Sequence, residues 1–277
     1  MKTIVFLNNK GGVGKTASTT TIVHMMATKF NKKVLLIDLD PQMNSSVMFS
    51  EIDFVSIFES VYLGKKDFAE KGIEKLFKDD SADIHDCIVH TSYENLDIIP
   101  SCLTLSEAEE AMKAQVVVPQ QFKLQNHLAK IKDEYDYIII DCMPSLSTLT
   151  INVLSCVDSV IIPVQAAYLP VKGLEQLIKT ISKVKRHLNP KIEIEGILIT
   201  MVDSRTNYAK DITTMLREAY GRNIKIFENH IPMSVRAQEA STQGMSIFRH
   251  DPKGKVAQAY QTLTEEVIGS EKWCKQY

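Results

Sequence analysis

The sequence predicts an α/β fold in which a doubly wound, mostly parallel β-sheet is flanked by helices. Short, nearly continuous apolar segments alternate along the chain with longer segments of helical periodicity. Strands that are apolar throughout are typical of parallel sheets covered on both faces, and strand–helix alternation is typical of doubly wound folds. In addition, a glycine-rich loop lies between the first expected strand and the first expected helix, which is the context of a phosphate-binding loop.

The individual elements follow from hydrophobic periodicity. Six short, β-rich apolar segments are expected to form strands: Thr3–Leu7, Val34–Ile37, Leu96–Ile99, Tyr137–Ile140, Val160–Val164 and Gly196–Thr200. Seven segments with helical spacing are expected to form helices: Lys15–Lys29, Leu105–Lys113, Gln121–Glu134, Leu146–Leu154, Gly173–Leu188, Tyr208–Tyr220 and Val256–Ile268. Residues 51–95 are acidic and weakly periodic, and we expect short helices there, packed against the sheet edge. No Pro-, Gly- or Ser-rich linker divides the chain, so we expect one domain over residues 1–277.

Composition excludes several classes of protein. Apolar residues make up 44% and charged residues 24% of the 277 residues, which is ordinary for a globular protein and argues against disorder or a coiled coil. The five cysteines include no CxxC pair, so neither a disulfide framework nor a zinc ribbon is expected. No apolar run approaches the roughly 18 residues of a membrane span, and the N-terminus lacks a signal peptide pattern. We therefore expect a cytoplasmic protein.

Charge is distributed unevenly along the chain. The net charge is only 32 − 34 = −2, yet all six arginines lie after residue 185. Residues 51–110 contain 15 acidic and 5 basic residues, whereas residues 172–225 contain 11 basic and 6 acidic residues. Such asymmetry is typical of a protein that presents a charged surface to a partner.

The glycine-rich loop spans residues 9–16 and reads Asn-Lys-Gly-Gly-Val-Gly-Lys-Thr. Glycines permit positive φ and let backbone N–H groups converge on an anion, and the following helix adds its positive N-terminal end. The residues expected to cradle phosphates are Gly11, Gly12, Val13 and Gly14. In loops of this kind the lysine reaches the β- and γ-phosphates and the next hydroxyl binds Mg²⁺, which assigns these roles to Lys15 and Thr16.

A second lysine departs from the ordinary pattern. Asn9 stands where the common P-loop has glycine, and Lys10 lies just inside the loop. Within one subunit Lys10 is redundant with Lys15. It has a purpose if it neutralises phosphates bound to a facing subunit, so we expect it to act across a dimer.

Carboxylates are expected around this loop because strand C-termini point into the ligand crevice of such folds. Asp38 and Asp40 end the second expected strand and are followed by Pro41, while Asp141 ends the strand Tyr137–Ile140. An acidic residue at that strand end can hold Mg²⁺ through water.

At this point the chain resembles the ParA/MinD family of ATPases, whose phosphate loop is of the deviant Walker A type. The resemblance is carried by KGGVGKT at residues 10–16 and by Asp38-Leu39-Asp40-Pro41-Gln42 with Asn44, and it extends over most of the chain. It implies ATP and Mg²⁺ as cofactors, a weak basal ATPase activity and an ATP-sandwich dimer in which Lys10 acts in trans. It further implies that Asp40 positions the attacking water and that Asp38 supports the Mg²⁺ shell beside Thr16 and Asp141. Ala17 and Pro232 complete the implied nucleotide site.

Three functions known for proteins of this fold are considered for the chain. The first is a ParA-type ATPase that segregates plasmid or chromosomal DNA. The second is a MinD-like, membrane-associated positioning ATPase, but the C-terminal end lacks the aliphatic stripe and cationic face of a membrane helix. The third is a metabolic P-loop enzyme, such as a nitrogenase iron protein or a ligase similar to dethiobiotin synthetase. The DPQxN segment and two arginine-containing segments favour the first reading, and with it no membrane partner.

The ParA resemblance also implies what the chain binds. Arg205 and Arg236 lie in segments similar to those in which family members contact DNA non-specifically, and Arg217 and Arg222 are further candidates. The implied partners are double-stranded DNA and a ParB-type centromere-binding adaptor that accelerates hydrolysis, which would associate the protein with the nucleoid. Because the first strand is expected at Thr3, we expect no N-terminal helix-turn-helix extension.

Overall fold

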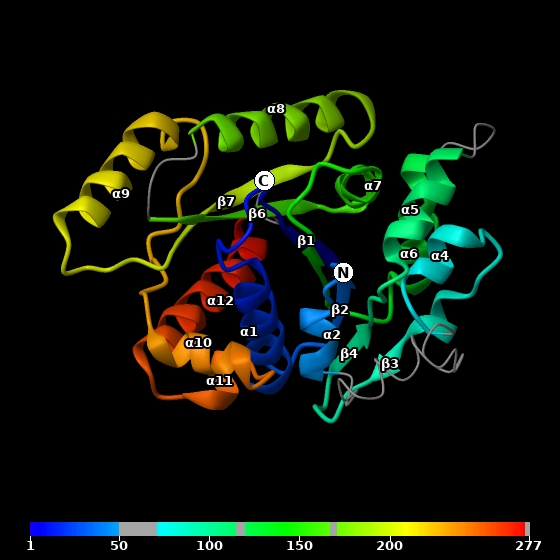
Figure 1. Cartoon of the computed structure of the whole chain (residues 1–277), viewed down its shortest axis with the longest axis horizontal. Coiled ribbons are helices and arrows are strands. Elements are labelled where there is room, and N and C mark those ends of the chain that lie inside the picture. The colour runs from blue at the N-terminus through cyan, green and yellow to red at the C-terminus, as the bar shows by residue number, and fades with distance from the viewer. Residues whose placement is uncertain (50–70, 115–119, 167–170, 275–277) are drawn as a thin grey trace.

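A single seven-stranded sheet organises the protein, in the order β3-β4-β2-β5-β1-β6-β7 (Figure 1). The computed structural model describes residues 1–49, 71–114, 120–166 and 171–274. Every neighbouring pair of strands is parallel except β3 and β4, which are antiparallel. The strands are β1 Lys2–Phe6, β2 Val34–Leu39, β3 Val89–His90, β4 Leu96–Ile99, β5 Tyr137–Cys142, β6 Ser159–Gln165 and β7 Glu193–Thr200. The predicted mostly parallel sheet and its six apolar strands are confirmed.

Helices cover both faces of this sheet and bury two apolar cores (Figure 1). One face carries α1 Lys15–Thr28, α2 Asn44–Phe49, α10 Val235–Thr242, α11 Ile247–His250 and α12 Lys255–Cys274. The other carries α4 Glu74–Lys78, α5 Leu105–Ala114, α6 Lys123–Leu128, α7 Thr148–Cys156, α8 Val171–His187 and α9 Asn207–Tyr220. Side chains alternate between the faces along each strand, so Ile4 enters one core and Val5 the other.

The structure corrects some element predictions. The expected helix Gln121–Glu134 is instead the 3₁₀ turn η3 Gln120–Phe122, α6 and the 3₁₀ turn η4 Ala129–Ile131. Leu124, Leu128 and Ile131 are buried with helical spacing, but apolar spacing does not distinguish α from 3₁₀ hydrogen bonding. Helix α12 continues past its expected end at Ile268 to Cys274. The elements that sequence analysis missed are all short, because they offer too few apolar positions to show a period: α2, α10, α11 and β3.

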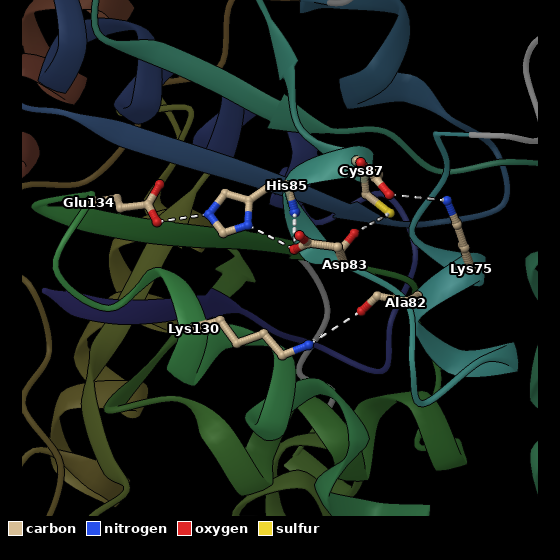
Figure 2. A network of polar contacts seen from close by, with 8 residues as sticks. Lys75, Ala82, Asp83, His85, Cys87, Lys130 and Glu134 are labelled. Atoms are coloured by element: carbon tan, nitrogen blue, oxygen red, sulfur yellow. Dashed lines mark hydrogen bonds and ion pairs between the residues drawn. The ribbon is translucent and has the colours of Figure 1, made fainter.

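The described part of the acidic segment, residues 71–95, contains α4, the 3₁₀ turn η2 Ile84–Cys87 and the edge strand β3. Short helices at the sheet edge are therefore confirmed for these residues, while residues 50–70 lie outside the described part. Figure 2 shows how η2 is held. The ring of His85 bridges Asp83 Oδ1, 2.8 Å from Nδ1, and Glu134 Oε1, 2.9 Å from Nε2, and Lys130 Nζ donates to the Ala82 carbonyl at 3.4 Å.

We predict that this bridge makes the edge segment more stable near neutral pH than at alkaline or strongly acid pH. Hydrogen bonds to Glu134 and then Asp83 raise the pKa of His85. Its contribution is fully present below the ordinary histidine pKa of about 6.5 and is lost as the pH rises through the raised folded value. It also falls at acid pH, because hydrogen bonding to His85 lowers the pKa of Asp83, which must then take up a proton. The ring is half exposed, so the effect is at most about 1 kcal/mol.

The measurement is the free energy of unfolding from about pH 6 to about pH 9 for the wild type and His85→Gln. The variant should lose part of the decline in stability with rising pH, whereas the exposed His230→Gln serves as a control that should not. Identical pH profiles for His85→Gln and the wild type would contradict the prediction.

Candidate functional site

The register of three neighbouring strands brings two carboxylates together at the carboxyl edge of the sheet. Phe6 of β1 pairs with Asp141 of β5, and Asp38 of β2 pairs with Asp141 from the other side. Because these strands are parallel, their C-terminal ends meet at one edge, where ligands of open α/β sheets bind. Asp38 and Asp141 therefore lie side by side, next to the loop that follows β1.

That loop is preorganised to hold an anion. Gly12 and Gly14 have φ of +71° and +83°, a conformation that side-chain-bearing residues rarely adopt, and Gly14 is the N-cap of α1. A Cβ placed on Gly11 or Gly12 would meet nothing within 4 Å, so their backbone faces open space. Thr200 Oγ1 donates to the Val13 carbonyl at 2.9 Å and holds the loop from β7. Backbone N–H groups at a helix N-terminus are suited to phosphate.

The two lysines of the loop occupy different environments. Lys15 is only 7% exposed, and its Nζ donates to the Lys10 carbonyl at 3.0 Å. Burial lowers the pKa of Lys15, and the negative charge of Asp141 is the largest opposing influence. Lys10 is half-buried, and its backbone N–H donates to Asn8 Oδ1 at 3.0 Å. The structure thus buries Lys15 in the wall of the site and leaves Lys10, which precedes Gly11 in the loop, half-buried.

Asp141 lies between hydroxyl groups of two helices. Ser45 Oγ of α2 donates to its Oδ2 at 2.6 Å, and Thr19 Oγ1 of α1 lies 3.5 Å from its Oδ1. A hydrogen bond from Thr16 also lowers its pKa. The predicted pair of Thr16 and Asp141 is therefore brought together by the fold.

Asp38 is engaged by its own loop. Its Oδ1 accepts from the Asp40 backbone N–H at 3.0 Å, and its Oδ2 accepts from the backbone N–H and the Oγ of Ser46 at 2.8 and 2.7 Å. Asp40 is half-buried and lines the cavity in front of the loop. Asp38 is thus a support of the loop, and Asp40 is the carboxylate that faces the cavity.

The two buried carboxylates, Asp38 and Asp141, would be stabilised by a bound cation. Burial, and then the charge of Asp141, raises the pKa of Asp38 to about 7. Burial raises the pKa of Asp141 to about 6, and the charge of Asp40 adds to that rise. Two desolvated, like-charged neighbours are costly when both are ionised, and the buried Lys15 adds a positive charge near Asp141. Carboxylate and hydroxyl oxygens are ligands that Mg²⁺ accepts, so the donor set of Thr16 and Asp141 fits this ion.

A cavity of about 440 Å³ opens in front of these groups, a size typical of small-ligand sites. Of the residues expected to bind nucleotide, the cavity is lined by Gly11, Gly12, Gly14, Lys15, Thr16, Ala17 and Pro232. Sequence analysis missed the contributions of α2 and of helices α10 and α12, including Ser45, Ser46, Ala237 and Tyr260. A signal was available for the serines, since both directly follow the Asp40-Pro41-Gln42 segment and its Asn44.

The predicted DNA-binding arginines fall into two groups. Arg205 lies in the loop before α9 and Arg236 lies in the first turn of α10; the segments just before them are joined where the Met233 N–H donates to the Val202 carbonyl at 3.0 Å. Each has an acidic neighbour: the Arg205 guanidinium binds both oxygens of Asp203, at 2.9 and 2.8 Å, and Arg236 lies 3.6 Å from Glu239. Arg217 and Arg222 lie toward the other end of α9, which spans roughly 20 Å. They line an open hollow of about 590 Å³ together with Lys225.

Comparisons of the sequence with known proteins find a family model described as an AAA domain, which matches residues 1–194. The sporulation initiation inhibitor protein Soj of Bacillus subtilis is 39% identical over 269 residues, which cover 97% of this chain and 99% of Soj. The chromosome partitioning protein ParA of Myxococcus xanthus is 36% identical over 265 residues, which cover 96% of this chain and 87% of ParA.

Comparisons of the structure find the same architecture in solved proteins. A cobyrinic acid a,c-diamide synthase from Mycobacterium smegmatis, with bound ATP analogue and magnesium, has a TM-score of 0.81 and 26% sequence identity, covering 97% of this chain and 94% of the synthase. A plasmid partition protein from Borrelia burgdorferi has a TM-score of 0.71 and 26% identity, covering 97% of this chain and 98% of that protein.

We predict that Asp141→Asn stabilises the nucleotide-free protein by about 0.5–2 kcal/mol at pH 8, because it removes one of two adjacent buried charges. Burial raises the folded pKa values of both carboxylates, so the stability of the wild type falls as the pH rises through about 6 to about 7. The gain should therefore shrink toward about pH 5, where the wild-type carboxylates are protonated.

Thermal unfolding across this pH range measures the effect. Asp40→Asn, at a half-buried position, is the matched control and should give no comparable gain. A lower melting temperature for Asp141→Asn than for the wild type at pH 8 would show that repulsion does not dominate at this pair.

Proposed function

The chain belongs to the family of ParA and Soj partition ATPases, and from this membership we propose that it is an ATP-driven switch in DNA partition. The single observation that carries the proposal is the glycine loop of residues 9–16 set directly beside Asp38 and Asp141 at the carboxyl edge of the sheet. The names of the most similar sequences supply the biological context, and the site supplies the chemistry.

ATP and Mg²⁺ fit the groups that the site offers. The open backbone of Gly11 and Gly12 and the N-terminus of α1 would hold the phosphates, with Lys15 reaching them from within. Thr16 and Asp141 would hold Mg²⁺, which supplies charge neutralisation at the β- and γ-phosphate oxygens. Ala17 and Pro232, on the cavity wall, would contact the nucleoside.

Hydrolysis requires a water molecule to attack the γ-phosphorus, which breaks its bond to the bridging oxygen and releases ADP and phosphate. Asp40 is the carboxylate that faces the cavity, so it would orient this water by accepting a hydrogen bond. Lys10 is half-buried in the same loop, and its ammonium would reach the nucleotide of a facing subunit. Because the site would be completed only by a second subunit and a partner protein, its basal rate of ATP hydrolysis would be low.

The ATP-bound dimer would bind double-stranded DNA through its arginines, without sequence preference, because guanidinium contacts to phosphate carry no sequence information. A ParB-type adaptor would stimulate hydrolysis and return the protein to its free state. The backbone contact between Met233 and Val202, just before Arg236 and Arg205, supports a common surface for these two arginines. Doubling that surface in a dimer would offset the net charge of −2 per chain.

Two other functions have less support. A MinD-like role would use an amphipathic helix that lies on the membrane surface, and the C-terminal end of the sequence lacks the aliphatic stripe and cationic face of such a helix. In the described part of the chain no helix has the length and apolarity to cross a bilayer. The synthase from M. smegmatis shares the architecture at 26% identity, whereas the chromosome partitioning protein ParA of M. xanthus is 36% identical. The closer sequence similarity favours partition over a metabolic reaction.

We predict that Lys10→Ala binds ATP with nearly wild-type affinity but hydrolyses it about 10²–10³ times more slowly, because it loses one preorganised charge at the transition state. Lys15→Ala is the contrasting variant and should lose nucleotide binding itself. Turnover and affinity are measured on the same preparations, in the presence of DNA. Unchanged turnover in Lys10→Ala would disprove the role across the dimer.

We predict that the double variant Arg205→Ala with Arg236→Ala loses ATP-dependent binding to random duplex DNA. Each phosphate contact contributes about −0.9 to the slope of log K against log salt concentration. Two arginines in each of two subunits would contribute about −3 to −4, and the double variant should flatten the slope by that amount. A salt titration with ATP and with ADP measures it.

Asp203→Asn is the opposite test of the same surface, because the bidentate contact with Asp203 offsets the charge of Arg205. This variant should bind DNA more tightly than the wild type at equal salt. Equal DNA binding by the wild type and the double variant, or tight binding with ADP, would show that Arg205 and Arg236 are ordinary surface residues.

A further inference from the structure

Two consecutive serines of α2 bind the two buried carboxylates of the site. Ser45 and Ser46 are both 0% exposed. Ser45 Oγ donates to Asp141 Oδ2 at 2.6 Å, and Ser46 donates to Asp38 Oδ2 through its backbone N–H at 2.8 Å and its Oγ at 2.7 Å. Successive helical residues point in different directions, so the pair reaches two neighbouring strand ends at once.

Ser45 controls which way the Asp141 carboxylate faces. With Oδ2 held by Ser45, Oδ1 is turned toward α1, where Thr19 Oγ1 lies 3.5 Å away. The Asp141 carboxylate also receives a hydrogen bond from Thr16. Without the Ser45 hydroxyl, the short side chain of Asp141 would be free to rotate away from Thr16. A neighbour that orients a ligand in this way is a general determinant of metal affinity.

Ser46 acts on the other carboxylate and, through it, on the loop that carries Asp40. Asp38 accepts from the Asp40 N–H with one oxygen and from Ser46 with the other, so it ties the two ends of that loop together. Ser46 Oγ in turn accepts from the Ser101 N–H at 2.9 Å, which anchors α2 to the end of β4. Met43, midway along the loop, has φ of +57°, and such strain persists only where the surroundings impose it.

We propose that these adjacent serines are positioning residues with separable tasks. Ser45 orients Asp141 for Mg²⁺, and Ser46 positions Asp40 for the attacking water through Asp38. The assignment rests on the proposed function, and it deepens that function by dividing the support of one site between two neighbouring hydroxyl groups.

The test separates cation binding from turnover. Binding of a fluorescent, non-hydrolysable ATP analogue is titrated with Mg²⁺, and ATP turnover is measured at saturating Mg²⁺. Ser45→Ala should raise the half-saturating Mg²⁺ concentration by about 10–100-fold, as expected when the support of a metal ligand is lost. Ser46→Ala should keep the wild-type Mg²⁺ dependence but lower kcat by at least about tenfold, with little change in KM.

Ser155→Ala is the matched control, because Ser155 is also a buried helical serine, 1% exposed, whose Oγ donates to the Ile151 carbonyl of α7 at 2.8 Å. It should leave both readouts at wild-type values. Each variant is first checked for a cooperative thermal unfolding transition. If Ser45→Ala fails this check, Ser45→Cys replaces it, since its thiol occupies the same place as a much weaker donor, and the same direction of change is expected.

The outcomes distinguish the assignment from the function on which it rests. A wild type whose analogue binding does not respond to Mg²⁺ would overturn the proposed function and the assignment together. A normal Mg²⁺ response in the wild type with an unchanged half-saturation in Ser45→Ala would overturn the assignment alone. Equal impairment of both readouts in Ser45→Ala and Ser46→Ala would also overturn the assignment alone.

Discussion

Two desolvated carboxylates at adjacent strand ends are the constraint around which this site is built. Asp38 and Asp141 are buried, paired in register and alike in charge, and burial raises the pKa of each. Such an arrangement survives only when hydrogen-bond donors satisfy it. The hydroxyls of Ser45, Ser46 and Thr19 supply those donors from two helices. The two adjacent buried charges still lower the stability of the fold, at the place where a bound cation would recover it.

The surrounding backbone is shaped to the same end. The loop after β1 passes through the left-handed region at Gly12 and Gly14, while Met43 and Met201 hold positive φ without being glycines. Met43 lies in the Asp40 loop and Met201 directly follows β7, and Met201 lines the cavity. Unusual backbone conformations concentrate at functional sites because a packed scaffold can hold them. Here the scaffold is the sheet edge and the two cores that flank it.

The order of the strands also separates the acidic and basic stretches of the chain in space. Residues 71–97 include β3 and β4 at one edge of the sheet, whereas the basic stretch of residues 172–225 includes β7 at the other edge, together with α8 and α9 (Figure 1). The acidic and basic stretches of the sequence therefore lie on opposite sides of the site. Asp203 and Glu239 neighbour Arg205 and Arg236, so local pairing decides how much of the charge of these arginines reaches a partner.

The sequence by itself determined the fold class, six of the seven strands of the described sheet and the loop with its lysines, because these depend on local signals. Apolar runs, glycine spacing and the placement of Asp38, Asp40 and Asp141 at strand ends are all readable along the chain. Only the tertiary structure decided which carboxylate is bound by its own loop and which arginines lie in neighbouring segments. It also decided that Ser45 and Ser46 reach the strand ends. Those outcomes depend on strand order and register, which place residues about 100 positions apart within hydrogen-bonding distance, as Ser45 and Asp141 are. Periodicity along a chain carries no information about such distant pairs.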